Sequence, residues 1–199
     1  GTGAYHADKP LRTWLASRQA HNGPCPVGVE FPRRTGPFLW REEHDTPRLE
    51  LSGGVATATL KLPGATVRRS IRQRPDQNGW EVSDACEGKR GTAQTFTVRW
   101  QFPPGSRVKR TSERAFRICR AGSVLIVEVA KEWNDVQLIR PIVDPAGEQS
   151  PGTSAPAGDL EGIVSPAFRQ ICRAPFLKLT ARGDKPCVFT TTFLASAHS

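Results

Sequence analysis

The feature that most constrains the fold is a set of short segments in which apolar and polar residues alternate. The clearest is residues 95–102 (TFTVRWQF), whose apolar members are Phe96, Val98, Trp100 and Phe102. A period of two residues is that of a β-strand with one face buried and the other face exposed. Residues 95–102 are therefore predicted to form a strand with its apolar side in a core.

Similar segments recur along the chain after residue 54, with glycine, proline or asparagine between them. Residues 55–62 and 67–74 flank Pro63-Gly64-Ala65-Thr66, which predicts a hairpin. Residues 123–130 (SVLIVEVA) are apolar enough for a central strand. Further strands are predicted at 80–84, 116–119, 136–143, 176–180 and 188–194. This series predicts an all-β fold, a two-sheet and mostly antiparallel β-sandwich with less than about a fifth of its residues helical.

The first fifty residues do not follow this pattern. Prolines at positions 24, 26, 32 and 37 interrupt regular structure, and residues 9–20 are compatible with a short helical turn or an irregular strand. Long N-terminal loops are therefore expected, and loops on a rigid scaffold are where binding chemistry usually lies.

The domain organisation follows from the strands near the C-terminus. Residues 144–158 (DPAGEQSPGTSAPAG) predict a surface loop and not a domain linker, because strand segments resume after them. Residues 1–199 are accordingly expected to form a single domain. The chain begins with Gly1 and contains no methionine, which indicates a fragment of a larger protein.

The charge balance favours an acidic partner. The formal net charge is +9 and the isoelectric point about 9.9, and 21 of the 28 basic residues are arginine. Nucleic acid, an anionic membrane surface and an acidic polysaccharide are all partners that fit this charge. The alternative is that the arginine content reflects the composition of the source genome and has no function. Nucleic acid is disfavoured, since the basic residues are scattered through the strands. No apolar run approaches the roughly 18 residues of a membrane span, so no membrane insertion is expected.

Cysteine spacing excludes two classes of small protein. The five cysteines are widely separated and none forms a C-x-x-C pair, which argues against a zinc ribbon or a disulfide-rich scaffold. One or two disulfides, or free and partly buried thiols, both remain compatible with the sequence.

The N-terminal region holds the candidate functional side chains. His21-Asn22, within SRQAHNG, can bind and neutralise a substrate carboxylate or hold a metal, whereas the simpler interpretation is a loop histidine bonded to the backbone. His44-Asp45 offers a further metal cluster with His21, although a solvated charged loop is the favoured interpretation.

Tyrosine and arginine add to this set. Tyr5 is the only tyrosine, and a phenol can act as a general acid or base, but packing in the sheet is the alternative role. Arginine forks recognise carboxylates and sulfates in a bidentate geometry. The substrate-binding candidates of this kind are Arg12, Arg18, Arg33 and Arg34. Solvated surface arginines are the alternative for most of them.

Several segments together resemble a known family. Residues 1–23 (GTGAYHADKPLRTWLASRQAHNG) are similar to the start of the C-terminal β-domain of heparinase II/III-like proteins, in which G-T-G-x-Y leads to an A-H-N motif. Residues 67–71 (VRRSI) and 79–88 (GWEVSDACEG) resemble the family's H-R-R strand and its W-x-V-x-D-x-x-x-G strand. Residues 165–196 resemble the terminal strand pair. The resemblance extends in order over nearly the whole chain.

The resemblance implies a polysaccharide lyase built from an N-terminal α/α toroid, absent from this sequence, and the present sandwich. Such enzymes cleave uronate-containing chains, for example heparan sulfate, alginate or an exopolysaccharide, by β-elimination. The reaction needs a base for the C5 proton, groups that neutralise the adjacent carboxylate, and an acid at the leaving oxygen. The toroid supplies most of the acid–base pair, and the position matching the sandwich's histidine is His21, followed by Asn22. The implied partners are an acidic polysaccharide and the toroid, and the implied location is periplasmic or secreted.

Three departures from the family pattern bear on function. Val67 stands where several members have a zinc-binding histidine, so no zinc of that kind and no other cofactor is expected. Pro24 and Pro26 follow the A-H-N motif and are expected to disrupt that strand. The arginine usual before A-H-N is displaced, with Ala16 near its place and Arg18 close by.

Two functions follow from these observations. The first is part of a lyase that is inactive as the isolated chain, and it predicts His21 in a basic cleft. The alternative is a non-catalytic module that binds polysaccharide or stabilises its partner domain, and it predicts His21 buried away from any cleft.

Overall fold

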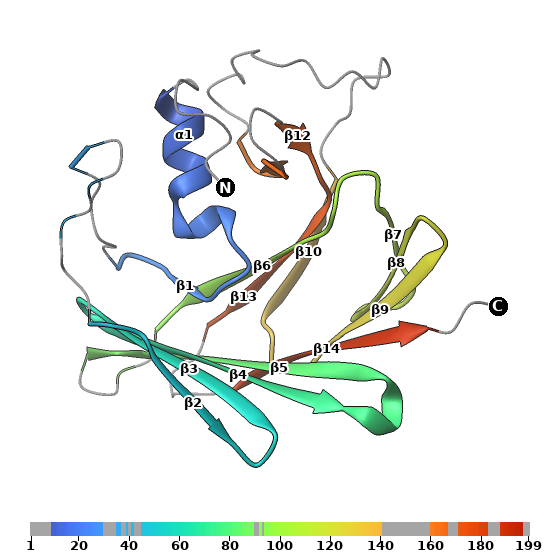
Figure 1. Cartoon of the computed structure of the whole chain (residues 1–199), viewed down its shortest axis with the longest axis horizontal. Helices are drawn as coiled ribbons and strands as arrows, with labels where there is room; N and C mark the ends of the chain where they lie inside the picture. Colours follow the sequence, from blue (N-terminus) through green and yellow to red (C-terminus); the bar gives the residue numbers. More distant parts are fainter. Residues whose placement is uncertain are drawn as a thin grey trace.

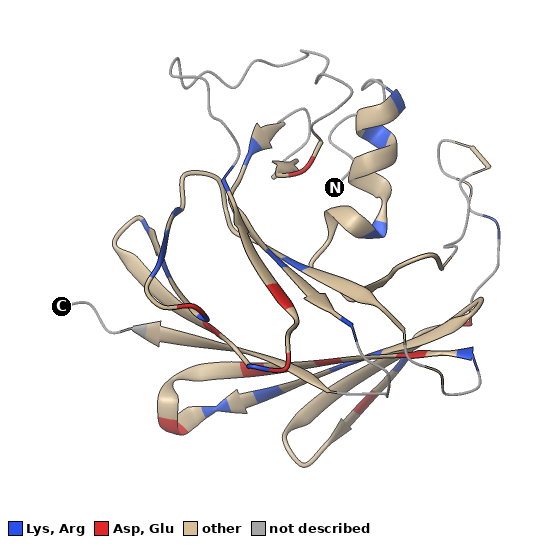
Figure 2. Cartoon of the chain, turned by 180° about the vertical axis from the view of Figure 1, so that it is seen from behind, with Lys and Arg blue, Asp and Glu red and all other residues tan. Residues whose placement is uncertain are grey.

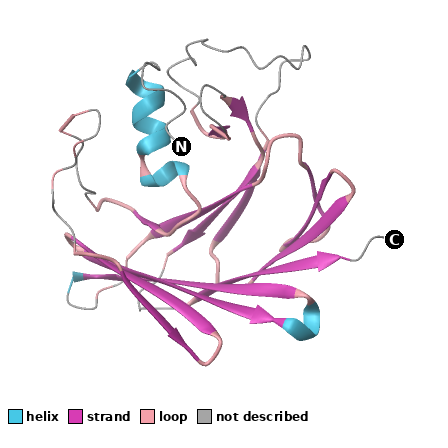
Figure 3. Cartoon of the chain, viewed as in Figure 1, coloured by secondary structure: helices cyan, strands magenta, loops and turns pink. Residues whose placement is uncertain are grey.

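The computed structural model describes residues 9–29, 35–36, 39, 41, 45–89, 92, 94–140, 160–166, 171–182 and 188–196. Strands dominate this part of the chain, and helices are few and short (Figure 3). Two antiparallel sheets face each other (Figure 1). Helix α1 (Lys9–Ala16) and the short strands β11 (Ile163–Val164) and β12 (Cys172–Arg173) lie outside the smaller sheet. The predicted two-sheet antiparallel sandwich is confirmed.

The larger sheet has eight strands in the order β2-β3-β4-β5-β14-β9-β8-β7. Their bounds are β2 Arg48–Ser52, β3 Val55–Leu62, β4 Ala65–Arg74, β5 Gly79–Gly88, β14 Phe189–Ser196, β9 Ser123–Val129, β8 Ala115–Arg120 and β7 Arg107–Arg110. Sequence patterning predicted each of these strands except the two at the edges, β2 and β7. The apolar segment predicted as a central strand is β9, which lies between β14 and β8.

The smaller sheet has the order β1-β6-β13-β10. Its strands are β1 Cys25–Pro26, β6 Phe96–Gln101, β13 Phe176–Ala181 and β10 Asp135–Ile139. A separate pair is formed by β11 Ile163–Val164 and β12 Cys172–Arg173. The helices are α1 Lys9–Ala16 and the 3-10 turns η1 Arg18–Ala20 and η2 Pro75–Gln77. The predicted loop at 144–158 lies outside the described residues.

The β3–β4 hairpin is tighter than its sequence suggested. Leu62 pairs directly with Ala65, so the turn consists of Pro63 and Gly64 alone. Gly64 has a φ of +102°, a backbone conformation that glycine adopts without a steric penalty. Ala65 and Thr66 therefore extend β4 beyond the predicted start at residue 67.

The core between the sheets is centred on aromatic side chains. Phe96 on β6 packs edge-on against Trp133 and Phe189, with ring centroids 5.7 and 5.4 Å apart. Trp133 is fully buried, and its indole nitrogen donates to the carbonyl of Thr190 at 3.0 Å. The apolar side of β6 predicted from its period of two does face this core.

A second apolar cluster covers the outer side of the smaller sheet. Leu11 and Leu15 of α1 are buried with Ile163 of β11, and Trp14 packs against them. This spacing of three and four residues places the apolar side chains on one face of a helix, so residues 9–16 adopt the helical alternative. Arg99 of β6 is also buried on this outer side of the smaller sheet. The alternation in β6 had placed Arg99 on the polar side of the strand.

The prolines after the A-H-N motif do not abolish the strand there. Cys25 and Pro26 pair with Thr97 and Phe96, and Val27 donates to the carbonyl of Thr95 at 2.8 Å. The expectation of a disrupted strand was wrong at these two residues, because β1 is an edge strand, where a missing N–H need not face a neighbour.

The described cysteines are thiols. Cys25 and Cys86 are buried, Cys119 and Cys172 are partly buried, and all four are free. Burial raises the pKa of Cys86 to about 12, which suppresses the reactive thiolate. Cys187 lies outside the described residues. Among the helices that the structure describes, none has the length and apolar character needed to cross a membrane.

Candidate functional site

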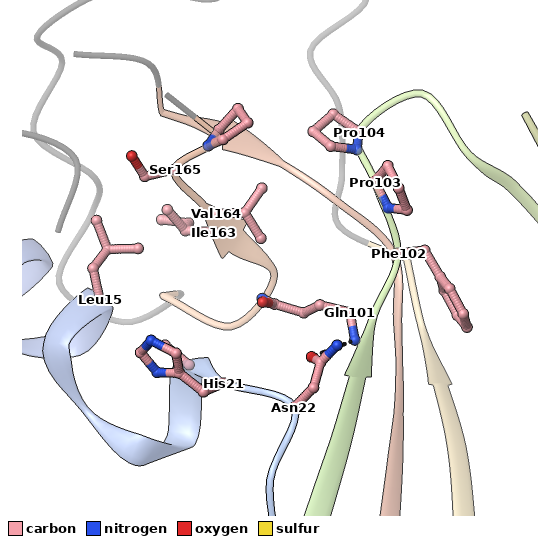
Figure 4. Close-up of a pocket in the computed structure, with 12 residues that line it drawn as sticks. Leu15, His21, Asn22, Gln101, Phe102, Pro103, Pro104, Ile163, Val164 and Ser165 are labelled. Carbon is pink, nitrogen blue, oxygen red and sulfur yellow. Dashed lines mark hydrogen bonds between the residues drawn. The ribbon is translucent and has the colours of Figure 1, made fainter. Parts of the chain in front are cut away.

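An open cleft of about 420 Å³ lies at the end of β6, between the N-terminal segment and β11 (Figure 4). One wall is formed by α1, η1 and the two residues after η1, and the opposite wall by β11 and the residues after it. The end of β6 and the loop that follows form the floor. The lining residues are Leu15, Ala20, His21, Asn22, Gln101, Phe102, Pro103, Pro104, Ile163, Val164, Ser165 and Pro166.

His21 is exposed in this cleft and its ring is oriented by the backbone. Nδ1 lies 2.7 Å from the carbonyl oxygen of Ser17. Because a carbonyl oxygen only accepts, Nδ1 carries a hydrogen, and Nε2 is the ring nitrogen left to exchange a proton. The side chain thus makes the backbone bond of an ordinary loop histidine and still has a basic nitrogen for chemistry.

Asn22 is exposed beside it and is fixed through both of its oxygens. Its side-chain Oδ1 accepts the backbone N–H of Gln101 at 3.0 Å, and its backbone carbonyl accepts from Nη1 of Arg69. Since the carboxamide is planar, this bond to Gln101 also restrains Nδ2, which is a donor only. Asn22 therefore lines the cleft with its side chain restrained through Oδ1 and with Nδ2 as its hydrogen-bond donor.

Arg69 is itself held between the two sheets. Its Nε and Nη2 donate to the two carboxylate oxygens of Asp84, each at 2.7 Å. The guanidinium carbon lies 4.5 Å from the ring centre of Trp100, in a cation–π arrangement. Asp84 is 0% exposed; burial raises the pKa of its carboxyl, and the hydrogen bonds of Arg69 oppose that effect.

Sequence reasoning missed Arg69 and Asp84 as supports of the site. A signal was present, because Val67, Arg69 and Ile71 fall on one side of β4 and Val82 and Asp84 on one side of β5. Val67 and Val82 are buried, so charged residues of opposite sign stand on faces that turn into the core. A buried pair of charges was therefore implied, but its contact with Asn22 was not.

The predicted substrate-binding arginines are only partly described. Nε of Arg18 donates to the carbonyl of Pro24 at 2.9 Å, which ties η1 to the start of β1, and burial lowers the pKa of Arg18. Arg12 is half-buried on α1. Neither lines the cleft. Arg33, Arg34, Tyr5 and His44 lie outside the described residues, and the roles of all these residues remain predictions.

The opposite wall is attached to the smaller sheet by Glu161, just before β11. Its Oε1 accepts from Nη2 of Arg99 at 2.8 Å and from Nζ of Lys178 at 3.2 Å. Burial acts to raise the pKa of Glu161, but the hydrogen bonds from Arg99 and Lys178 outweigh it, so the pKa lies below its usual value.

The cleft is not basic over the residues that the structure describes. None of its twelve lining residues is lysine or arginine, contrary to the expected basic cleft. Basic residues occur on α1 and across the strands of both sheets (Figure 2). An acidic ligand in this cleft would be bound by hydrogen-bond donors and by cations from outside it.

The residues present do not fit the family's zinc site. Val67 is 2% exposed and packs in the core between the sheets, so that position has no donor atom for a metal. Within the described ranges, no group of three or more histidine, cysteine, aspartate or glutamate side chains could hold an ion. A zinc-free protein remains a prediction, which elemental analysis of the purified chain tests.

The chain was compared with protein families, with curated protein sequences and with solved structures. The family model described as Heparinase II/III-like, C-terminal matches residues 1–157. No curated protein sequence matches the chain. Two solved structures of one heparinase III gene product, one of them with methylated lysines, superpose with TM-scores of 0.61 and 0.63 at 15% and 14% identity. Each superposition covers 98% of this chain and 27% of the solved one. A crystal structure of heparinase III gives a TM-score of 0.58 at 11% identity, over 97% of this chain and 26% of that one.

Proposed function

The chain belongs to the heparinase II/III-like C-terminal family of polysaccharide lyases, and we propose that it is one part of a lyase for an acidic, uronate-containing polysaccharide. The chain spans about a quarter of the length of the solved heparinase III chains. We infer that the remaining catalytic groups come from an N-terminal toroid of a larger parent protein. The observation that supports this proposal best is the exposed His21, with Nδ1 fixed and Nε2 left as the basic nitrogen.

The proposed reaction is a β-elimination across C4 and C5 of the uronate. A base removes the C5 proton, the electron pair forms the C4–C5 double bond, and the C4–oxygen bond breaks. The leaving oxygen then takes a proton from an acid. Nε2 of His21 has the chemistry for one of these two proton transfers. Nδ2 of Asn22 can donate to the uronate carboxylate, whose neutralisation makes the C5 proton easier to remove.

We propose that the isolated chain does not turn substrate over. His21 supplies one of the two proton-transfer groups, and each such group typically contributes about 10² to 10⁴ in rate. Formation of the unsaturated uronate product is followed by absorbance near 232 nm. The chain alone should give no sustained increase, whereas the parent protein should give one that His21→Ala abolishes.

A matched control is Gln19→Ala, since Gln19 is exposed on η1 and does not line the cleft. This variant should leave the activity of the parent protein unchanged. Sustained turnover by the isolated chain would show that no further domain is needed. Full activity of His21→Ala in the parent protein would remove His21 from the mechanism.

Binding to the polysaccharide should be weak and sensitive to salt. The net charge of +9 attracts uronate and sulfate groups, and exposed charges are screened beyond about 8 Å at physiological ionic strength. Retention of the chain on heparin or alginate should therefore fall steeply as salt rises. Arg12, Arg18, Arg33 and Arg34 remain the proposed contacts for the acidic groups.

A non-catalytic polysaccharide-binding or structural module is the second candidate function. It is favoured by the lack of lysine and arginine among the described lining residues of the cleft. This function predicts no turnover by the parent protein with any uronate polysaccharide. Salt-sensitive retention of the chain together with no turnover by the parent protein would identify a binding module. Neither retention by the chain nor turnover by the parent protein would leave a structural role.

A further inference from the structure

We propose that Arg69 is a positioning residue that fixes the His21–Asn22 segment at the cleft. The inference rests on the proposed function only for its catalytic consequence, because the geometry itself can be tested without turnover. Arg69 lies behind Asn22 on β4 and does not line the cleft. Arg69 would therefore affect the substrate only indirectly. It would do so by holding Asn22, and by holding His21, which precedes Asn22 in the chain.

Three contacts leave the guanidinium of Arg69 little freedom. Nε and Nη2 are engaged by the carboxylate of Asp84, Nη1 by the carbonyl of Asn22, and the flat face by the ring of Trp100. Asp84 is fully buried, which excludes water as a competitor for its oxygens. A bidentate pair of this kind fixes direction as well as distance. The third nitrogen is thereby aimed at Asn22.

Asn22 is consequently held from both sheets at once. Arg69 belongs to the larger sheet and binds the backbone of Asn22, while Gln101 belongs to the smaller sheet and binds its side chain. Trp100, which supports Arg69, directly precedes Gln101. On its other side, His21 is tied to Ser17 through Nδ1. His21 and Asn22 are thus held on both sides, by Ser17 on one side and by Arg69 and Gln101 on the other. A functional site must hold its side chains within about half an ångström, which requires support of this kind.

The arrangement requires arginine and not merely a positive charge. The guanidinium uses three separate nitrogens for three acceptor oxygens on two residues, whereas the ammonium of lysine is a single point on a flexible stem. Lysine at position 69 would neutralise Asp84 but would not also hold the Asn22 carbonyl in the same geometry. The substitution Arg69→Lys therefore separates positioning from charge.

The first test compares Arg69→Lys with Arg68→Lys in the 199-residue chain. Arg68 is the preceding residue on β4 and is exposed, so it is the matched control. Proton–nitrogen NMR spectra would report the Asn22 side-chain amide and the His21 ring nitrogens. Arg69→Lys should shift or broaden both sets of signals, and Arg68→Lys should leave them unchanged. Unchanged Asn22 and His21 signals in a folded Arg69→Lys variant would overturn the proposal.

A second variant removes the risk that a lone buried charge unfolds the chain. Arg69→Met combined with Asp84→Leu replaces both charges by apolar groups of similar size, a change that is often tolerated. The double variant should fold and keep its sheet signals while the Asn22 amide shifts or broadens. Wild-type positions for Asn22 and His21 in this variant would also overturn the proposal.

The catalytic consequence is tested in the parent protein. Arg69→Lys should lower kcat about 10- to 100-fold with a smaller change in KM, since a displacement of about 1 Å can cost a factor of this size. Wild-type kcat in Arg69→Lys would remove the catalytic role of Arg69. If the wild-type parent has no lyase activity, the proposed function fails, and the NMR comparison still decides whether Arg69 positions Asn22.

Discussion

The two walls of the cleft are each anchored by an ion pair, but the two anchors differ in their exposure to water. Behind the His21–Asn22 wall, Arg69 pairs with Asp84, whose side chain is 0% exposed. At the opposite wall, Arg99 and Lys178 pair with Glu161, whose side chain is 37% exposed. The first lies between the sheets, and the second lies on the outer side of the smaller sheet.

This difference in exposure decides what each anchor can do. A buried carboxylate has no alternative partner, so the Arg69–Asp84 contact is retained as long as the sheets stay packed. Glu161 can exchange its protein partners for water, but Arg99, 9% exposed, then loses its counter-charge, so breaking this contact should cost less than breaking Arg69–Asp84 and more than breaking a surface pair. The His21–Asn22 wall is therefore expected to be rigid, and the opposite wall, formed by β11 and the residues after it, is expected to open more easily.

The largest effect is expected from Asp84→Ala. Removing the carboxylate leaves the Arg69 guanidinium in a site 17% exposed and without its counter-charge, which should lower the free energy of unfolding by about 3–5 kcal/mol. Chemical denaturation measures this change. The matched control is Asp76→Ala, because Asp76 is 66% exposed and 4.0 Å from Arg74 on the same hairpin. Equal losses of unfolding free energy in the two variants would mean that burial does not make the Arg69–Asp84 pair more important than the exposed Arg74–Asp76 pair.

A smaller effect is expected from Glu161→Gln. The substitution removes the charge of Glu161 but keeps an Oε1 acceptor for Arg99, whose side chain is 9% exposed. Because this acceptor is retained and Glu161 is itself 37% exposed, the cost should be about 1 kcal/mol. The loss should be local, so hydrogen exchange should accelerate at Ala174, whose N–H donates to the carbonyl of Gly162 at 2.8 Å. Protection of the amides of β6 should not change. A global loss of protection would show that this wall is as integral to the fold as the other.

Acid should weaken the same wall selectively. The pKa of Glu161 lies below its usual value of 4.5 in the folded chain, so its stabilising contribution is complete above the unfolded-state pKa. That contribution is lost as the pH falls through the lower, folded-state pKa. Exchange at Ala174 should accelerate in this range in the wild type more than in Glu161→Gln. An identical pH dependence in both proteins would contradict the assignment.

The smallest effect is expected for the most exposed of these ion pairs. Arg48 and Glu50 on β2 lie 3.7 Å apart, with side chains 81% and 63% exposed. Glu50→Gln should change the free energy of unfolding by less than about 0.5 kcal/mol. A loss as large as that of Glu161→Gln would break the proposed ordering by exposure.

Much of the sandwich could be predicted from local patterning, and the site only in part. Residues 55–62 coincide with β3, and the alternation in β6 identified its core side correctly. The edge strands β2 and β7 were missed, since each has one paired neighbour and β2 is exposed along its length. His21 and Asn22 were candidates from the A-H-N motif, and both line the cleft, but the residues that hold them in place were not predicted.

What the sequence by itself determined is which residues turn to the same side of a strand, because a period of two is a local property of the backbone. What only the tertiary structure decided is what covers each side. Arg99 was on the polar side of β6, but it is buried, with its guanidinium near the ring of Trp14 on α1 and paired with Glu161 just before β11. The contacts that fix Asn22 join residues 47 and 79 positions apart, so they depend on how the sheets pack and where the N-terminal segment docks. No short-range sequence pattern encodes the packing of the sheets or the docking of the N-terminal segment. The geometry of the cleft depends on both.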